Sequence, residues 1–136
     1  MGYRVRVVDP RRAFTTAERF PMADEVVVAW PQDALPADAL RPSDAVVALA
    51  HDPKIDVPAL ATALRSPVGY VGLLGSRRTQ AARRKALREE GLSEEDLARI
   101  HGPVGFDLGA APEEITLGIL AEIVATHNGK SGRPKA

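Results

Sequence analysis

Short apolar runs recur along the chain, and each of them stops at a proline, a glycine or an acidic residue. Runs of about four to eight apolar residues between turn signals are typical of strands that are buried in a parallel sheet. They predict strands at residues 4–9, 25–29, 44–50 and 70–74. A smaller strand is expected around Val104 and Phe106.

Helix-opening signals lie between these runs. Proline and acidic residues open one helix at Asp56–Pro58 and another at Pro112, while Ser76 and Ser93 stand where N-cap residues are expected. These signals predict helices over residues 56–65, 77–90, 93–100 and 112–127, with brief helical turns at residues 15–19 and 35–40.

The last predicted helix carries apolar residues on two sides. At helical spacing, Ile115, Ile119 and Ile123 form one stripe. A second stripe on roughly the opposite side consists of Leu117, Leu120, Ala121 and Val124. We therefore expect one side of this helix to meet the sheet and the other to meet a partner element or subunit.

Strands that alternate with helices over short connections predict an α/β fold with a mainly parallel sheet and flanking helices. We expect one domain over residues 1–129 and a flexible basic tail over residues 130–136. Ligands of such folds bind beyond the carboxyl ends of the strands. This rule predicts one rim that carries Asp9, Trp30, His51–Asp52 and Gly75–Ser76.

Composition narrows the class of protein. The chain has 18 Lys and Arg against 18 Asp and Glu, and its aromatic content is 4%, which argues against nucleic acid or an anionic membrane as a partner. It has no cysteine, so a disulfide, a thiolate metal site and a cysteine nucleophile are excluded. No apolar run approaches the roughly 20 residues of a membrane span, and no signal peptide opens the chain. A cytoplasmic location is the simplest expectation.

The clearest candidate binding site is the turn at residues 75–78. Gly75 allows the backbone to approach a ligand closely, and Ser76 stands as the N-cap of a helix that begins with Arg77 and Arg78. Backbone amides, the positive end of a helix dipole and two guanidinium groups together favour an anion. The motif is not a Walker loop, which needs a longer glycine run and a lysine. A tight turn with solvated arginines is the alternative.

Three further positions have both a ligand interpretation and a structural one. Asp9 could hold a ribose hydroxyl, but no G-x-G-x-x-G turn accompanies it, so a capping role is equally supported. His51 and Asp52 could contact a ligand or a partner, or form a turn; a metal would need three or four ligands, which the other histidines do not supply by spacing. Asp107, in a glycine-rich loop, could face a ligand hydroxyl or amine, or bind loop amides.

Several segments of the chain resemble the hallmark sequences of the XdhC/CoxI family. The strongest matches are Tyr-Val-Gly-Leu-Leu-Gly-Ser-Arg-Arg-Thr at 70–79, Arg-Ile-His-Gly-Pro-Val-Gly-Phe-Asp-Leu-Gly-Ala at 99–110, and Pro-Glu-Glu-Ile with Ala-Glu-Ile inside 112–123. Residues 19–26, the strand ending at Asp9, and His51–Asp52 also match, although Ala50 replaces the family's threonine. The likeness extends over the chain to about residue 129 and is specific, because unrelated loops match in order.

The resemblance implies a Rossmann-like domain of an accessory factor that matures molybdenum hydroxylases of the xanthine or carbon monoxide dehydrogenase type. It implies binding of the molybdenum cofactor, as molybdopterin or its dinucleotide form, and work with a sulfur-donor desulfurase and the target hydroxylase. Residues 75–78 would hold phosphate, and the other candidate positions would complete the cofactor site. We therefore expect an insertion chaperone with no catalytic residue, no resident metal and no turnover of its own.

Two other classes of function stay open. One is a nucleotide-binding oxidoreductase domain of the NAD(P) type, which the missing glycine turn and the lack of a nucleophile–base set disfavour. The other is a protein-interaction domain that binds no small molecule.

The chain also departs from the family pattern. Family members usually have a further N-terminal domain, then a first Rossmann strand and a glycine-rich turn, and none of these is found here. In the usual strand order the first strand lies between the strands that end at Asp9 and Asp52, so two edges would be unpaired. We expect a truncated chain, half of a split protein, a rearranged sheet, or a strand borrowed from a partner. That partner would be a second copy or the missing N-terminal domain.

Overall fold

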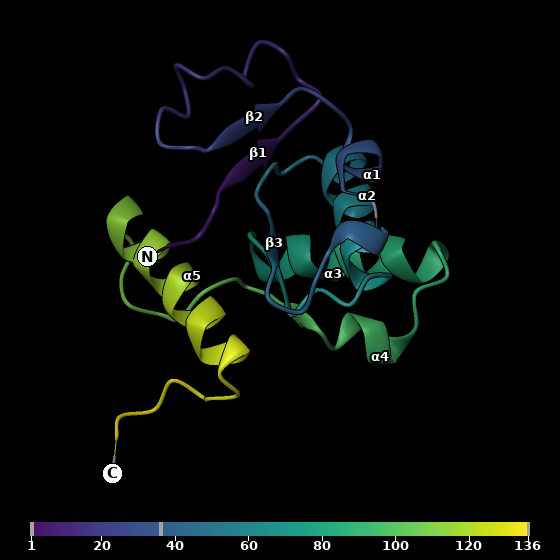
Figure 1. Cartoon of the computed structure of the whole chain (residues 1–136). Helices are drawn as coiled ribbons and strands as arrows, with labels where there is room; N and C mark the ends of the chain where they lie inside the picture. Colours follow the sequence, from purple (N-terminus) through teal and green to yellow (C-terminus); the bar gives the residue numbers. More distant parts are fainter. Residues whose placement is uncertain (1, 36, 136) are drawn as a thin grey trace.

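Parallel strands form two separate sheets in the computed structural model, which describes residues 2–35 and 37–135 (Figure 1). The first sheet pairs β1 (Arg6–Val8) with β2 (Glu25–Val27). The second sheet has the order β3-β4-β5 and consists of β3 (Ala45–Ala48), β4 (Tyr70–Leu73) and β5 (Ile100–His101). Every pairing is parallel. The predicted α/β class with a mainly parallel, Rossmann-like sheet is confirmed.

Helices connect these strands and cover the second sheet. They are α1 (Pro31–Ala34), the 3-10 helix η1 (Ala37–Ala39), α2 (Pro53–Leu64), α3 (Arg77–Glu89), α4 (Glu94–Leu97) and α5 (Pro112–His127). Figure 1 shows α2 and α3 on one side of β3 and α5 on the other. The second sheet is therefore the middle layer of three.

The hydrophobic core is built on β3, β4 and β5. Its larger cluster packs side chains of α2 and α3, such as Leu60 and Leu87, against Leu73 of β4, and all three are 0% exposed. A smaller cluster on the opposite face joins Tyr70 and Val104 to α5. Burial of this kind contributes about 1.5–3 kcal/mol for each large apolar side chain. Neither cluster contains a residue of β1 or β2.

The last helix follows the prediction on one side. Ile123 is 5% exposed and packs in the smaller cluster with Tyr70, and Ile119 packs beside it. The second stripe borders an open apolar groove, and Leu117 is 58% exposed. A partner element on that side stays a prediction.

Three predicted elements differ from the structure. The helix predicted over residues 93–100 ends at Leu97, and Ile100 begins the strand β5. The helix predicted over residues 56–65 is α2, and it begins at Pro53 rather than at Asp56–Pro58, because Asp52 is its N-cap and Pro58 lies inside the helix. Val104 is not in a strand; its amide donates to the carbonyl of Leu73 from a loop, and the short strand is β5 instead. Asp52 and Asp56 have similar helix-capping signals, and residues 100–101 and 104–106 have similar strand signals.

The two unpaired strand edges that the sequence predicts are present. Among the described residues, β1 pairs only with β2, and β3 pairs only with β4 on one side. The Rossmann-like sheet is thus interrupted between β1 and β3.

Candidate functional site

The turn between β4 and α3 has the geometry that the sequence predicts. Gly75 has φ +144°, and a Cβ atom there would lie 2.6 Å from Cγ2 of Thr79, so glycine is required. Ser76 is the N-cap of α3, and its hydroxyl accepts a hydrogen bond from the Thr79 amide at 3.3 Å. This cap directs the first turn of a 13-residue helix toward the rim.

Arg77 and Arg78 occupy that first turn, and both are exposed. Among residues 2–35 and 37–135, neither guanidinium group takes part in an ion pair. Positive side chains at a helix N-terminus add to the field of the helix dipole, and together they favour an anion. The arrangement can hold a phosphate group.

The side chain of Gln80 holds this turn in place, a role that the sequence analysis did not predict. Its Nε2 donates to the carbonyl oxygens of Leu73 at 2.9 Å and of Gly75 at 3.2 Å. Its Oε1 is buried against Gly102, with no hydrogen-bond partner in the described part of the chain. Gln80 therefore ties the end of β4 to the start of α3 and to the loop after β5. A glutamine in a basic helix gives no local sign of this role.

The turn between β3 and α2 holds His51 and Asp52. His51 is exposed and has φ +60°, a conformation that is uncommon for a residue with a side chain. Asp52 Oδ1 accepts the amide of Lys54 at 3.0 Å, which caps α2. One carboxylate oxygen of Asp52 therefore caps the helix, and the His51 side chain is exposed to solvent.

A buried ion pair connects α2 to α3. Arg83 Nε lies 3.4 Å from Asp56 Oδ2, and the two side chains are 9% and 2% exposed. Asp56 Oδ1 also accepts the amide of Ala50 at 3.2 Å. Because a buried carboxylate is costly without a partner, this pair fixes the two rim turns relative to each other. The sequence separation of 27 residues hides the pair from local patterns.

Asp9 is held by a residue two positions further along. The Arg11 guanidinium group donates to both carboxylate oxygens of Asp9, at 3.0 and 2.7 Å, and its backbone amide donates at 2.8 Å. The hydrogen bond from the Arg11 side chain lowers the pKa of Asp9, against the opposing effect of burial. Thr15 closes the turn with a hydroxyl that donates to the carbonyl oxygen of Arg11 at 2.7 Å. Asp9 therefore has the capping role that was its structural alternative.

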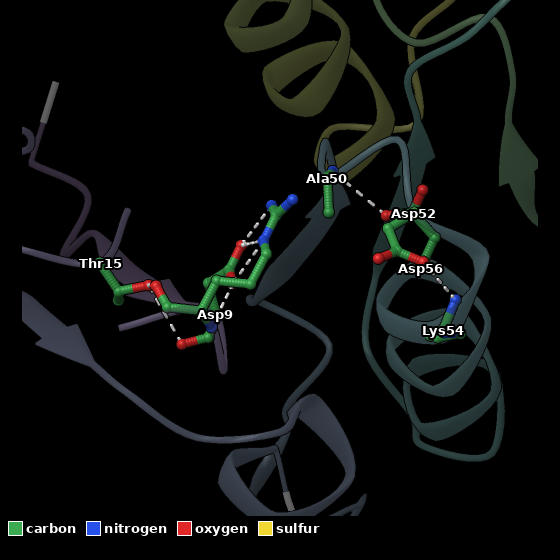
Figure 2. Close-up of polar contacts among 7 residues, drawn as sticks. Asp9, Thr15, Ala50, Asp52, Lys54 and Asp56 are labelled. Carbon is green, nitrogen blue, oxygen red and sulfur yellow. Dashed lines mark hydrogen bonds and ion pairs between the residues drawn. The ribbon is translucent and has the colours of Figure 1, made fainter. Parts of the chain in front are cut away.

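The rim turns of the two sheets face each other. The pKa of Arg11 is raised mainly by its hydrogen bonds to Asp9, and the negative charges of Asp52 and Asp56 add to this effect. Figure 2 shows Asp9 on one side and the turn with Asp52 and Asp56 on the other. The predicted rim thus brings Asp9 near Asp52, although these two described side chains share no hydrogen bond.

The loop that carries Asp107 is anchored at its start by a polar cluster. Glu122 Oε1 accepts hydrogen bonds from the Tyr70 hydroxyl at 2.6 Å and from the Gly105 amide at 3.1 Å. His101 stacks on the Tyr70 ring at 4.5 Å, and its Nδ1 lies 3.4 Å from Glu122 Oε1. Burial, and then Glu122, raises the pKa of Tyr70. Asp107 itself is exposed.

Metal-ligand clusters and membrane-spanning helices are both missing from the described residues. Residues 2–35 and 37–135 include no group of three or more histidine, aspartate or glutamate side chains placed to hold a metal ion. In the same ranges, none of the helices has the length and apolar character to cross a membrane.

Comparison with known proteins identifies relatives of this chain. Residues 1–123 match the family model described as the XdhC Rossmann domain. A protein of Bacillus subtilis (strain 168), named as a probable xanthine dehydrogenase subunit, is 34% identical over 126 residues, or 92% of the chain. The molybdenum cofactor insertion chaperone PaoD of Escherichia coli (strain K12) is 36% identical over 97 residues, or 68% of the chain.

A solved structure agrees with these matches. The crystal structure of a xanthine dehydrogenase from Bacillus halodurans aligns with 93% of the chain at a TM-score of 0.72 and 28% identity. The chain spans only 36%, 30% and 36% of the Bacillus subtilis, PaoD and Bacillus halodurans proteins, respectively.

Proposed function

The chain belongs to the XdhC Rossmann-domain family, and from this membership we propose that it serves as an accessory factor of a molybdenum hydroxylase. In this role it binds the molybdenum cofactor and assists its insertion into a hydroxylase of the xanthine or carbon monoxide dehydrogenase type. The names of two relatives support the proposal, since one is a molybdenum cofactor insertion chaperone and the other is named as a probable subunit of a xanthine dehydrogenase. The chain spans about a third of each relative, so the activity of the whole relatives is carried over here only as a proposal.

The first turn of α3 is the observation that carries the proposal. The molybdenum cofactor is anionic through its phosphate, and the exposed guanidinium groups of Arg77 and Arg78 stand at the positive end of a capped helix. Arginine can make two parallel hydrogen bonds to a phosphate group, which fixes its orientation as well as its position. Ser76 and Gly75 would allow that group to approach the backbone amides closely.

The remaining rim residues would contact the other end of the cofactor. A pterin ring carries N–H donors, which suit carboxylate acceptors rather than arginines. The exposed carboxylate of Asp107, the second oxygen of Asp52 and the ring of His51 are the groups that could receive them. Asp9, whose carboxylate is engaged by Arg11, would contribute through the shape of its turn.

Several finer assignments belong to the same proposal. The partners would be the target hydroxylase and a sulfur-donor desulfurase, with self-association as a second route to assembly. Residues 1–129 would form the binding domain, residues 130–136 a flexible basic tail, and the protein would work in the cytoplasm. We assign no catalytic turnover to it.

Titration with isolated molybdopterin cofactor tests the proposal. The chain has a single tryptophan, Trp30, which is 43% exposed and lies shortly after β2, so its fluorescence can follow binding. Replacing Arg77 and Arg78 with alanine should weaken binding about tenfold or more, because each charge-assisted hydrogen bond contributes about 1.5–3 kcal/mol. Lys85→Ala, an exposed substitution on the same helix, is the matched control and should leave affinity unchanged.

The competing functions give distinct results. If no cofactor binds, with or without the hydroxylase, but the hydroxylase itself is bound, the chain is an interaction domain. If NADH binds and is oxidised, the oxidoreductase alternative replaces the chaperone. If the arginine variant and Lys85→Ala lost equal amounts of cofactor affinity, the first turn of α3 would not be the binding site.

A further inference from the structure

The outer face of α5 is apolar and open to solvent. Figure 1 shows α5 at the outside of the molecule, with the second sheet to one side of it. The groove along its other side is lined by apolar residues of the helix and of the loop before it, namely Leu117, Leu120, Ala121, Val124, Phe106 and Leu108. Leu117 is 58% exposed and Leu108 is 49% exposed. A patch of exposed apolar side chains is typical of an interaction surface.

The apolar positions of this face are symmetric about the middle of the helix. Leu117 lies as far before the midpoint between Leu120 and Ala121 as Val124 lies after it. At about 100° per residue these four positions form one stripe, opposite the side on which Ile123 is buried. The stripe therefore has the same spacing in both directions, as two antiparallel copies related by a twofold axis require. In that arrangement Leu117 of one copy packs against Val124 of the other.

The two ends of the face carry complementary groups. Glu113 lies in the first turn of α5, about one helical turn before Leu117, and is exposed. Asn128 and Lys130 line the groove at its other end. Among residues 2–35 and 37–135, neither Glu113 nor Lys130 takes part in an ion pair. Antiparallel copies would bring Glu113 of each to Asn128 and Lys130 of the other, and their helix dipoles would also attract.

We propose that two copies of this chain associate through this face, with their α5 helices antiparallel about a twofold axis. Each copy places its exposed Leu117 in the groove of the other, beside Val124 and Phe106, so that every contact occurs twice. The apolar stripe supplies the affinity, and the charged ends fix the orientation. The inference rests on the self-association included in the proposed function and assigns a surface to it, but it does not require the cofactor.

Sedimentation of the intact chain, from micromolar to millimolar concentration and without cofactor, tests the inference. One helix face and one loop make a small interface, so we expect a monomer–dimer equilibrium with a dissociation constant of about 1 µM or weaker. Leu117→Glu should weaken dimerisation about a hundredfold or more, because both copies lose a buried apolar side chain and gain a charge there.

Two further sets of variants control this experiment. Ile115→Glu, the same kind of change at a 40% exposed residue on the opposite side of α5, should leave the dimer intact. Glu113→Lys or Lys130→Glu alone should weaken dimerisation about threefold or more, because each charged contact occurs twice and becomes repulsive. The double variant E113K/K130E should recover the affinity of the unsubstituted chain, since opposite charges again face each other. Circular dichroism confirms that each variant is folded.

Three results would overturn the inference. A monomer at every concentration would mean that a second copy does not cover this face. A dimer that withstands Leu117→Glu would place the contact elsewhere on the molecule. A double charge variant that dimerises no better than the single variants would exclude the antiparallel arrangement. Because no cofactor is present, failure of the dimer and failure of cofactor binding in the titration are separate results.

Discussion

The two sheets of this protein are built from similar apolar runs, yet only one of them has a core. All four residues of β4 are buried, whereas β1 and β2 contain no fully buried residue. The difference lies in what surrounds each strand. β4 has a strand on both sides and helices on both faces, while β1 has one strand beside it and an open groove. An apolar strand can be buried, but it is buried only where other strands and helices pack against it.

The largest expected contrast concerns the ion pairs of the two regions. Arg83→Met should destabilise the protein by about 3–5 kcal/mol, because it leaves the buried Asp56 carboxylate without its partner. Arg11→Met breaks the solvent-accessible pair with Asp9 and should have a much smaller effect. Urea denaturation followed by circular dichroism measures both. Equal losses would mean that the β1 region is as firmly folded as the core.

A core truncation sharpens the same comparison. Leu73→Ala in β4 removes a side chain that is 0% exposed and should cost about 2–5 kcal/mol. Val7→Ala in β1 removes a partly exposed side chain and should cost only about 0.5 kcal/mol. The free energies of unfolding of both variants are compared with that of the unsubstituted protein. If Val7→Ala lost more stability than Leu73→Ala, the side chains of β1 would belong to a hydrophobic core of their own.

The Tyr70 hydroxyl gives an intermediate effect with a defined pH dependence. Tyr70→Phe should cost about 1–3 kcal/mol at neutral pH, because Glu122 loses a buried donor. The raised pKa of Tyr70 means that its contribution is complete below the ordinary value of 10.0 and declines as pH rises above it. The unfolding curves of the two proteins should therefore differ at pH 7 and approach each other as the pH rises above 10. A difference that does not change with pH would contradict the raised pKa, and the absence of any difference would show that Tyr70 stabilises through its ring alone.

The smallest effect is expected at Asp9. Its lowered pKa means that the ionised carboxylate stabilises the fold above the ordinary value of 3.8, and that this contribution is lost as pH falls below it. Asp9→Asn should therefore be slightly less stable than the unsubstituted protein at pH 7 and equal to it in strong acid. Thermal unfolding across this range, with Trp30 as the local reporter, measures the difference. A larger deficit in acid than at pH 7 would contradict the assignment.

The sequence correctly predicted those features of the site that depend on residues close together in the chain. Gly75 and Ser76 are read correctly because a positive φ and an N-cap each depend on residues within one helical turn. The start of α2 was wrong because Asp52 and Asp56 both resemble caps, and burial of Asp56 against Arg83 decides between them. Gln80 and the Tyr70–Glu122 pair were missed because their partners come from other elements.

The sequence by itself determined the alternation of strands and helices, the capped turn before Arg77 and the family of the chain, because these depend on short-range patterns. Only the tertiary structure decided which apolar runs are buried and which stay half exposed, because burial depends on neighbours that are distant in the chain. It also paired Asp56 with Arg83 and brought the turn of Asp9 near that of Asp52. The division of the strands into the pair β1-β2 and the trio β3-β4-β5 is the clearest case, because strand order is a property of the folded sheet.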